Sequence, residues 1–295
     1  MRPVLVFLLF FIAALFAGAL LAYPLYLITG LFTDASFSSV IMKSTQLCGL
    51  VFSLLYLKYS DQLCLEHIGL KADRQQLTHQ MRSGFIGGLL LFSGLALALF
   101  AFGLYGFNSN RDLGVGAIVK LILGAILTGL AVALFEETVF RGALLQGLRK
   151  QAGMNQAVLT ISLLYAATHF INYTEPADPA AIGWLTAVQL FIPAYAGIFS
   201  LQTVDALLAL FVLGLLFAFV RIRTRNLFQC IGLHAGVVAG VKLFRYFAEY
   251  RPDNLHSYLV STYDYRLGWL ATVWLLLVTT AYFAWLHRKP KTTAS

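Results

Sequence analysis

Eight long apolar runs constrain the fold of this chain more than any other feature of its sequence. Each run approaches or exceeds the roughly 20 residues that an α-helix needs to cross the hydrocarbon core of a bilayer. Because hydrophobic residues make up 59% of the 295 residues and charged residues only 12%, a soluble domain of this length could not bury its apolar side chains. We therefore expect an all-α, polytopic membrane helical bundle. The expected spans are 4–30, 37–57, 84–107, 114–140, 154–173, 204–220, 227–247 and 267–287.

The first apolar run could instead be a signal peptide, with Ala17-Gly18-Ala19 as its cleavage site. Signal-peptide cores are short, whereas this run continues without a charged residue to Phe32. We therefore interpret it as the first span of a single integral membrane domain that covers residues 1–295.

The net charge of +8 comes largely from basic residues that cluster beside the apolar runs. Such juxtamembrane clusters are typical of cytosolic loops. No basic patch is interleaved with aromatic residues as a nucleic-acid surface would be, so we expect the lipid bilayer, and not nucleic acid, as a partner. The clustered residues are Lys58, Lys71, Arg74, Arg82, Arg149, Lys150, Arg221, Arg223, Arg225, Arg288, Lys289 and Lys291.

The distribution of lysine and arginine also predicts the orientation of the chain. If both termini are cytosolic and segment 181–200 does not cross, 14 of the 21 basic residues lie in the cytosol; if the segment crosses, 12 do. We therefore expect 181–200 to be a re-entrant or interfacial helix on the outer face, and 58–83 to be a short amphipathic cytosolic connection. The adjoining segment 173–181 has two acidic residues and no basic one, as an outer loop should. The inner membrane of a prokaryotic cell is the expected location.

The segment Leu134–Leu145, LFEETVFRGALL, places three charged residues within an apolar run. Each of them costs about 2.5–3.5 kcal/mol at the centre of a bilayer on insertion scales. On an α-helix Glu137 and Arg141 lie about 40° apart, as an i,i+4 pair, whereas Glu136 lies about 140° from the arginine. We therefore expect Arg141 to neutralise Glu137, and Glu136 to point elsewhere. The alternative is that all three charges lie at a cytosolic helix end.

Two histidines lie in other apolar runs, His169 in LLYAATHFIN and His234 in IGLHAGVVAGVK. A lone histidine in a membrane helix is often only a packing residue. Beside His234, however, glycines recur every four residues, at 232, 236 and 240, and small residues at this spacing let helices approach closely. The helix that carries His234 is therefore expected in the centre of the bundle.

Glu136, His169 and His234 on three neighbouring helices would form a polar centre within hydrocarbon. Such a centre suits a general base acting on water, with imidazoles that orient the water or stabilise an oxyanion, and no cofactor is then expected. One carboxylate and two histidines can equally bind zinc, although an HExxH motif is absent. Thiolate ligands and a disulfide framework are not expected, because the cysteines are scattered and form no CxxC motif: Cys48, Cys64 and Cys230.

Three motifs in this part of the chain resemble those of the CPBP family, the CAAX proteases and bacteriocin-processing enzymes, also called the Abi family. Glu136-Glu137-Thr-Val-Phe-Arg141 resembles the family's EExxxR motif. Tyr165-Ala-Ala-Thr-His169 is similar to FxxxH, with tyrosine in place of phenylalanine. His234-Ala-Gly-Val-Val238 resembles HxxxN or HxxxD. The motifs occur in the family's order, and the resemblance covers roughly 114–247, which would be the catalytic core.

The resemblance implies an eight-helix intramembrane endopeptidase that hydrolyses a peptide bond of a membrane-associated or lipidated protein or peptide. The family's eukaryotic members remove the last three residues of prenylated CAAX proteins. By resemblance, Glu136 activates the attacking water with the help of His169, and His234 contributes to an oxyanion hole. Glu137 and Arg141 would hold the helix. If the family's mechanism is metallo rather than glutamic, the same Glu136, His169 and His234 would be the zinc ligands.

One residue departs from the family's pattern. The asparagine or aspartate of the third motif is Val238 in this chain, which removes one expected donor to the oxyanion. Losing one such donor can lower a rate about 10²–10³-fold. Tyr165 and Asn172, each about one turn from His169, are the candidates to replace it.

Two other functions are compatible with the same residues. Because of Val238, the chain could be a catalytically impaired family member that acts as a binding or immunity scaffold. It could also be a proton-coupled transporter, because intramembrane carboxylates and histidines relay protons. Transporters commonly contain two matching halves with interrupted helices, and this sequence contains no such internal repeat. An endopeptidase is therefore the leading hypothesis.

Overall fold

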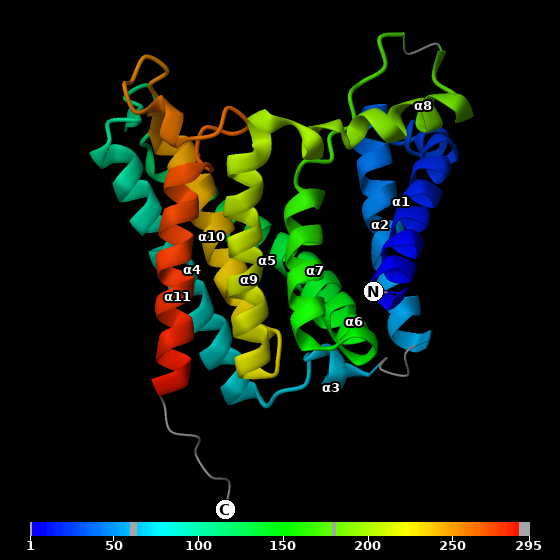
Figure 1. Ribbon diagram of the computed structural model, residues 1–295. Coiled ribbons are helices and arrows are strands. Elements are labelled where there is room, and N and C mark those ends of the chain that lie inside the picture. Colours follow the sequence, from blue (N-terminus) through cyan, green and yellow to red (C-terminus); the bar gives the residue numbers. More distant parts are fainter. Residues whose placement is uncertain (1, 60–63, 179–180, 289–295) are drawn as a thin grey trace, which may run out of the picture.

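The chain forms a helical membrane bundle in a computed structural model that describes residues 2–59, 64–178 and 181–288 (Figure 1). Six of the described helical segments are long and apolar enough to cross a membrane. Two further segments, 154–168 and 269–288, run alongside them in the bundle, which gives the expected arrangement of about eight spans. Lys289 and Lys291 of the predicted basic tail lie outside the described residues, as do 60–63 and 179–180 of the two predicted loops.

The helices follow the predicted apolar runs closely. The elements in chain order are α1 (Arg2–Thr29), α2 (Phe37–Tyr59), α3 (Leu65–Ile68), α4 (Arg74–Ala101), β1 (Tyr105–Phe107), α5 (Val115–Glu137), the π-helix η1 (Thr138–Leu144), α6 (Leu145–Ala152), α7 (Met154–Thr168), α8 (Trp184–Ala194), the 3₁₀ turns η3 (Ala196–Phe199) and η4 (Leu201–Thr203), α9 (Val204–Thr224), α10 (Phe228–Phe247), β2 (Ala248–Tyr250), the 3₁₀ turn η5 (Ser257–Leu259) and α11 (Trp269–Arg288).

Several helix boundaries differ from the predicted spans, among them the start of α4 and the end of α7. Helix α4 begins at Arg74, ten residues before the predicted span, because Asp73 caps it by accepting a hydrogen bond from the Gln76 N–H. Its first turns are polar, and a hydropathy criterion cannot detect helix of that kind. Helix α7 ends at Thr168, five residues before the predicted end of its span.

Segment 181–200 does not cross the bundle, as predicted. Helix α8 lies across the end of the bundle opposite α3 and α6 (Figure 1). Its 11 residues would span only about 16 Å, too little for the hydrocarbon core. Glu175, in the loop before it, accepts hydrogen bonds of 2.9 Å from the N–H groups of Phe37 and Ser38 at the start of α2. This loop is therefore fixed to the first helical hairpin.

Helices α4 and α10 form the most extensive helix–helix contact among the described residues, and glycines line it. A Cβ atom added to Gly232 or Gly236 of α10 would overlap the carbonyl oxygen of Met81 or Phe85 on α4. The predicted small-residue ridge therefore lets two backbones touch, and it places α10 in the centre of the bundle.

Helices α1 and α2 pair with each other as a hairpin that stands beside the remaining helices (Figure 1). The ring of Phe7 near the start of α1 lies 5.2 Å from the ring of Tyr56 near the end of α2, so the two helices are antiparallel. The hairpin contacts η1 and α6 at one end and α8 at the other. It thus forms a wall that faces the segment carrying the charged residues.

Candidate active site

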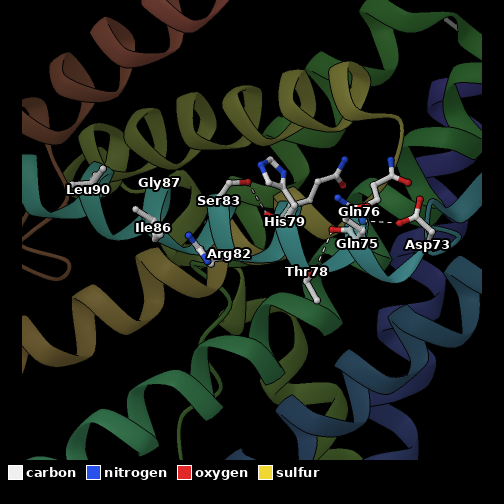
Figure 2. A pocket seen from close by; sticks show the side chains of 11 residues that line it. Asp73, Gln75, Gln76, Thr78, His79, Arg82, Ser83, Ile86, Gly87 and Leu90 are labelled. Carbon is white, nitrogen blue, oxygen red and sulfur yellow. Dashed lines mark hydrogen bonds between the residues drawn. The ribbon is translucent and has the colours of Figure 1, made fainter.

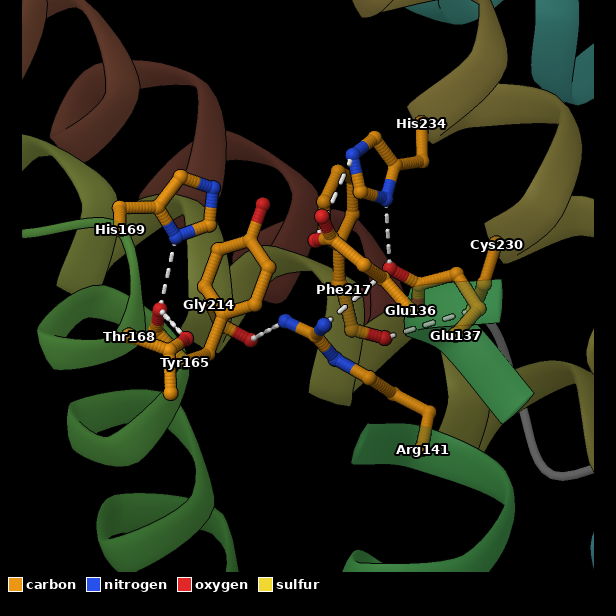
Figure 3. A network of polar contacts seen from close by, with 10 residues as sticks. All are labelled: Glu136, Glu137, Arg141, Tyr165, Thr168, His169, Gly214, Phe217, Cys230 and His234. Atoms are coloured by element: carbon orange, nitrogen blue, oxygen red, sulfur yellow. Dashed lines mark hydrogen bonds and ion pairs between the residues drawn. The ribbon is translucent and has the colours of Figure 1, made fainter. Parts of the chain in front are cut away.

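The predicted site residues come from three segments that meet inside the bundle (Figure 3). Glu136 and Glu137 end α5, Arg141 lies in the π-helix η1, and α10 supplies His234. The third segment is the end of α7. The chain stays helical through η1 into α6, and both Glu137 and Arg141 are buried, so the alternative of an exposed helix end is wrong.

Glu137 and Arg141 form the ion pair that their spacing predicts. Arg141 Nη1 lies 3.1 Å from Glu137 Oε1, and both side chains are at most 1% exposed. The guanidinium also donates a hydrogen bond of 3.3 Å from Nη2 to the carbonyl of Gly214 on α9. Its Cζ lies 4.3 Å from the ring centre of Tyr165 and 5.0 Å from that of Phe217, within the range of cation–π attraction. Arg141 therefore joins η1 to α7 and α9.

His234 lies between the two glutamates, a contact that the sequence did not predict. Its Nδ1 lies 2.9 Å from Glu137 Oε1, and because a carboxylate only accepts, Nδ1 carries the proton. Its Nε2 faces Glu136 Oε2 at 3.9 Å, which is too long for a direct hydrogen bond. The ring stacks on Phe217, with 5.1 Å between ring centres. Glu137 thus fixes the orientation of the imidazole as well as pairing with Arg141.

Glu136 is the more accessible of the two carboxylates. Its side chain is 24% exposed, whereas that of Glu137 is fully buried. Oxygen Oε2 of Glu136 is buried and accepts no hydrogen bond from any described residue. The side chain lines a cavity of about 310 Å³ between the α1–α2 hairpin, α5, η1 and the end of α7, and His169 lines the same cavity. A buried oxygen that lacks a donor, beside a cavity, is suited to hold a water molecule.

His169 caps the C-terminal end of α7 and presents one free ring nitrogen. Its Nδ1 lies 2.8 Å from the carbonyl oxygen of Tyr165, so Nδ1 is the donor and Nε2 is left as an acceptor. The backbone carbonyl of His169 accepts a hydrogen bond from the hydroxyl of Tyr263, in the loop before α11. The residue is therefore held at two points, its ring by the Tyr165 carbonyl and its backbone by Tyr263.

A second cavity, of about 200 Å³, lies on the other side of His169. It is lined by Tyr165, His169, His234 and Val238, by apolar side chains of α4, α9, α10 and α11, and by the ion pair of Asp264 and Arg266 in the loop before α11. The hydroxyl of Tyr165 points into the space between His169 and the Glu136 carboxylate (Figure 3), and it forms no hydrogen bond with a described residue. The imidazole of His169 thus borders both cavities.

Asn172 is not part of this site. The residue is exposed, lines neither cavity, and donates its backbone N–H to the carbonyl of Ala194. The prediction assumed that the helix of His169 continues through 172, whereas α7 ends at Thr168.

The hollow on the outer face of α4 around His79 and Arg82 contains none of the motif residues (Figure 2).

The residues present do not form a ready metal site. Among the described residues, no group of three or more His, Cys, Asp or Glu is arranged to hold a metal ion. Glu136, His169 and His234 are therefore not gathered as a zinc ligand set in the described part of the chain.

A family model described as type II CAAX prenyl endopeptidase Rce1-like matches residues 118–239. No match was found among curated proteins. The matched range contains all three motifs, from Glu136 to Val238, on α5 and η1, at the end of α7 and on α10. Residues 118–239 are therefore similar to the CAAX protease (CPBP) family, and the helices of the described residues are those of a multi-pass membrane protein.

Proposed function

We propose that this protein hydrolyses a peptide bond of a membrane-associated or lipidated protein, with Glu136 as the general base. The observation that carries the proposal is the unpartnered carboxylate oxygen of Glu136, which lines the same cavity as His169. Glu137 is not assigned this role, because it is fully buried, lines neither cavity and already accepts from Arg141 and His234 on Oε1.

The proposed reaction uses one water molecule between Glu136 and His169. His169 Nε2 accepts one proton of the water in a hydrogen bond, and Glu136 takes the other as the water oxygen attacks the peptide carbonyl carbon. The carbonyl double bond opens to an oxyanion. When the oxyanion collapses, the C–N bond breaks, and Glu136 returns its proton to the leaving amine.

The oxyanion needs a donor, and Tyr165 is the group that we propose. A neutral His234 carries its proton on Nδ1, towards Glu137, so its Nε2 could donate to an oxyanion only as an imidazolium. The Tyr165 hydroxyl can donate without any change of protonation, and it lines the same cavity as Val238. Tyrosine would thus replace the donor that Val238 lacks, with His234 assisting when protonated.

A comparison of Glu136→Gln with the wild type tests the function. Both proteins are purified in detergent and incubated with farnesylated peptides that end in a CAAX sequence and with unprenylated membrane peptides. We expect the substitution to lower the rate of any cleavage about 10²–10⁴-fold, because it removes proton transfer but keeps the size of the side chain. The exposed Glu66→Gln is the matched control, which should retain full activity. Equal cleavage by the Glu136 variant and the wild type would remove the assigned base.

We further propose that the end of the bundle carrying α3 and α6 faces the cytosol of a prokaryotic cell. Support comes from the basic residues that gather there, including Lys71 and Arg149. Cys64, exposed at this end, provides the test in a variant that lacks the other two cysteines. A membrane-impermeant thiol reagent should label it in inside-out vesicles and leave it unlabelled in intact cells. Labelling in intact cells would reverse the orientation.

A further inference from the structure

The cavity beside Glu136 has one wall outside the family-matched residues 118–239. That wall is the α1–α2 hairpin, which faces α5 and η1 across the cavity. Most of the hairpin residues on the wall are apolar, so the space fits an apolar segment of chain. They are Phe11, Leu15, Met42, Thr45, Gln46, Gly49 and Leu50.

Gln46 is the polar side chain on this wall with free hydrogen-bonding capacity. The neighbouring Thr45 is buried, and its hydroxyl already donates to the carbonyl of Met42 at 2.8 Å. Gln46, in contrast, is exposed, and its carboxamide forms no hydrogen bond with any residue that the structure describes. The carboxamide offers two donors and an acceptor to whatever occupies the cavity.

A peptide backbone matches this combination of an apolar wall and a free carboxamide. Backbone N–H and C=O groups that enter an apolar environment must find partners, because hydrocarbon offers none. A carboxamide can satisfy one C=O and one N–H of an extended segment at the same time. The Glu136 carboxylate and His169 line the same cavity, so a segment held by Gln46 would lie beside the proposed base.

We propose that Gln46 positions the substrate, by hydrogen-bonding the backbone of an apolar peptide segment that lies between α2 and the α5–η1 segment. This inference rests on the proposed endopeptidase function and adds a contribution from the first two helices. Gln46 does not touch the reacting atoms. Its loss therefore weakens substrate binding and leaves the chemical step largely intact.

Photo-crosslinking tests the contact without requiring catalysis. A benzoylphenylalanine is placed at position 46 or, as the matched control, at Leu47, which is 54% exposed and lines neither cavity. Both are made in the Glu136→Gln protein and irradiated with a biotin-tagged farnesylated CAAX peptide or with the same peptide lacking the farnesyl group. We expect position 46 to form at least several times more adduct than position 47 with one of these peptides. Equal adduct at the two positions would overturn the proposal.

Steady-state kinetics on the active protein give the second readout. Gln46→Leu should raise KM about tenfold with little change in kcat, the loss expected for roughly one hydrogen bond, and Gln46→Asn should recover part of it. Leu47→Ala should change neither constant. A KM unchanged in Gln46→Leu would refute the positioning role. Because the crosslinking uses an inactive variant, a failure of the base assignment and a failure of the Gln46 contact give different results.

Discussion

Replacing Arg141 by methionine removes the partner of a fully buried carboxylate. Glu137 would keep His234 as its remaining donor on Oε1, while Oε2 has no hydrogen-bond partner among the described residues. Breaking one side of a buried pair costs about 3–5 kcal/mol. About 1.4 kcal/mol corresponds to a tenfold change in an equilibrium constant, so the site in the Arg141→Met protein should be open at least about 100-fold more often than in the wild type. Methionine retains much of the apolar volume against Tyr165 and Phe217.

A buried thiol measures this opening directly. Cys230 is fully buried, and its Sγ lies 3.5 Å from the carbonyl of Phe217, whose ring contacts the Arg141 guanidinium. In a background with the other two cysteines replaced by alanine, the rate at which a maleimide labels this thiol in detergent reports how often the site opens. We expect labelling to be about 10²–10³-fold faster in Arg141→Met.

The double variant Glu137→Gln, Arg141→Met separates electrostatics from packing. It has no buried charge to leave unpaired, so its labelling rate should return most of the way to that of the wild type. If Arg141→Met labels at the wild-type rate, or if the double variant labels as fast as the single one, the ion pair does not hold the site together.

The remaining predictions concern three separate parts of the fold. Tyr165→Phe should lower kcat about 10²-fold with unchanged thermal stability if its hydroxyl stabilises the oxyanion; an unchanged kcat would exclude that role. Burial opposes a low pKa for Glu175, but hydrogen bonds from the start of α2 outweigh it and hold the pKa below 4.5. A carboxylate with a depressed pKa stabilises the fold above its unfolded-state pKa and loses that effect as the pH falls through its folded-state pKa. Glu175→Gln should therefore lower the melting temperature at pH 7, and this difference should shrink as the pH falls through the folded-state pKa; a difference that does not shrink on acidification would contradict the assignment. Gly236→Ala should destabilise the protein by about 1–3 kcal/mol in the thiol-labelling assay. Gly116→Ala should not, because a Cβ atom added at Gly116 would have no neighbouring atom within 4 Å. Similar effects of the two substitutions would argue against close α4–α10 packing.

The sequence predicted those features of the site that depend on local spacing. The Glu137–Arg141 pair is an i,i+4 contact and needs no knowledge of tertiary structure. The contact between Glu137 and His234 joins residues 97 positions apart, and nothing in either motif indicates it. The π-helix at η1 was also not predicted, because it is a departure from regular helix that hydropathy cannot detect.

The errors in the fold have the same origin. Hydropathy places the spans but not their ends, since helix ends depend on capping contacts such as that of Asp73, which the span prediction did not consider. Because α7 ends early, Asn172 lies outside the site. The proposed role of Gln46 depends on the tertiary contact that places α2 beside the Glu136 cavity, and hydropathy does not indicate such a contact. Charge counting, in contrast, correctly identified α8 as a helix that does not cross.

Cooperation between Glu136 and His169 is the most direct test of the proposed hydrolytic centre. The measurement is kcat/KM for the wild type, Glu136→Gln, His169→Ala and the double variant on one cleaved peptide. If both residues act on the same water molecule, the double variant should be about as slow as the slower single variant. A double variant slowed by the product of the two single effects, or a Glu136→Gln protein as fast as the wild type, would contradict a shared site.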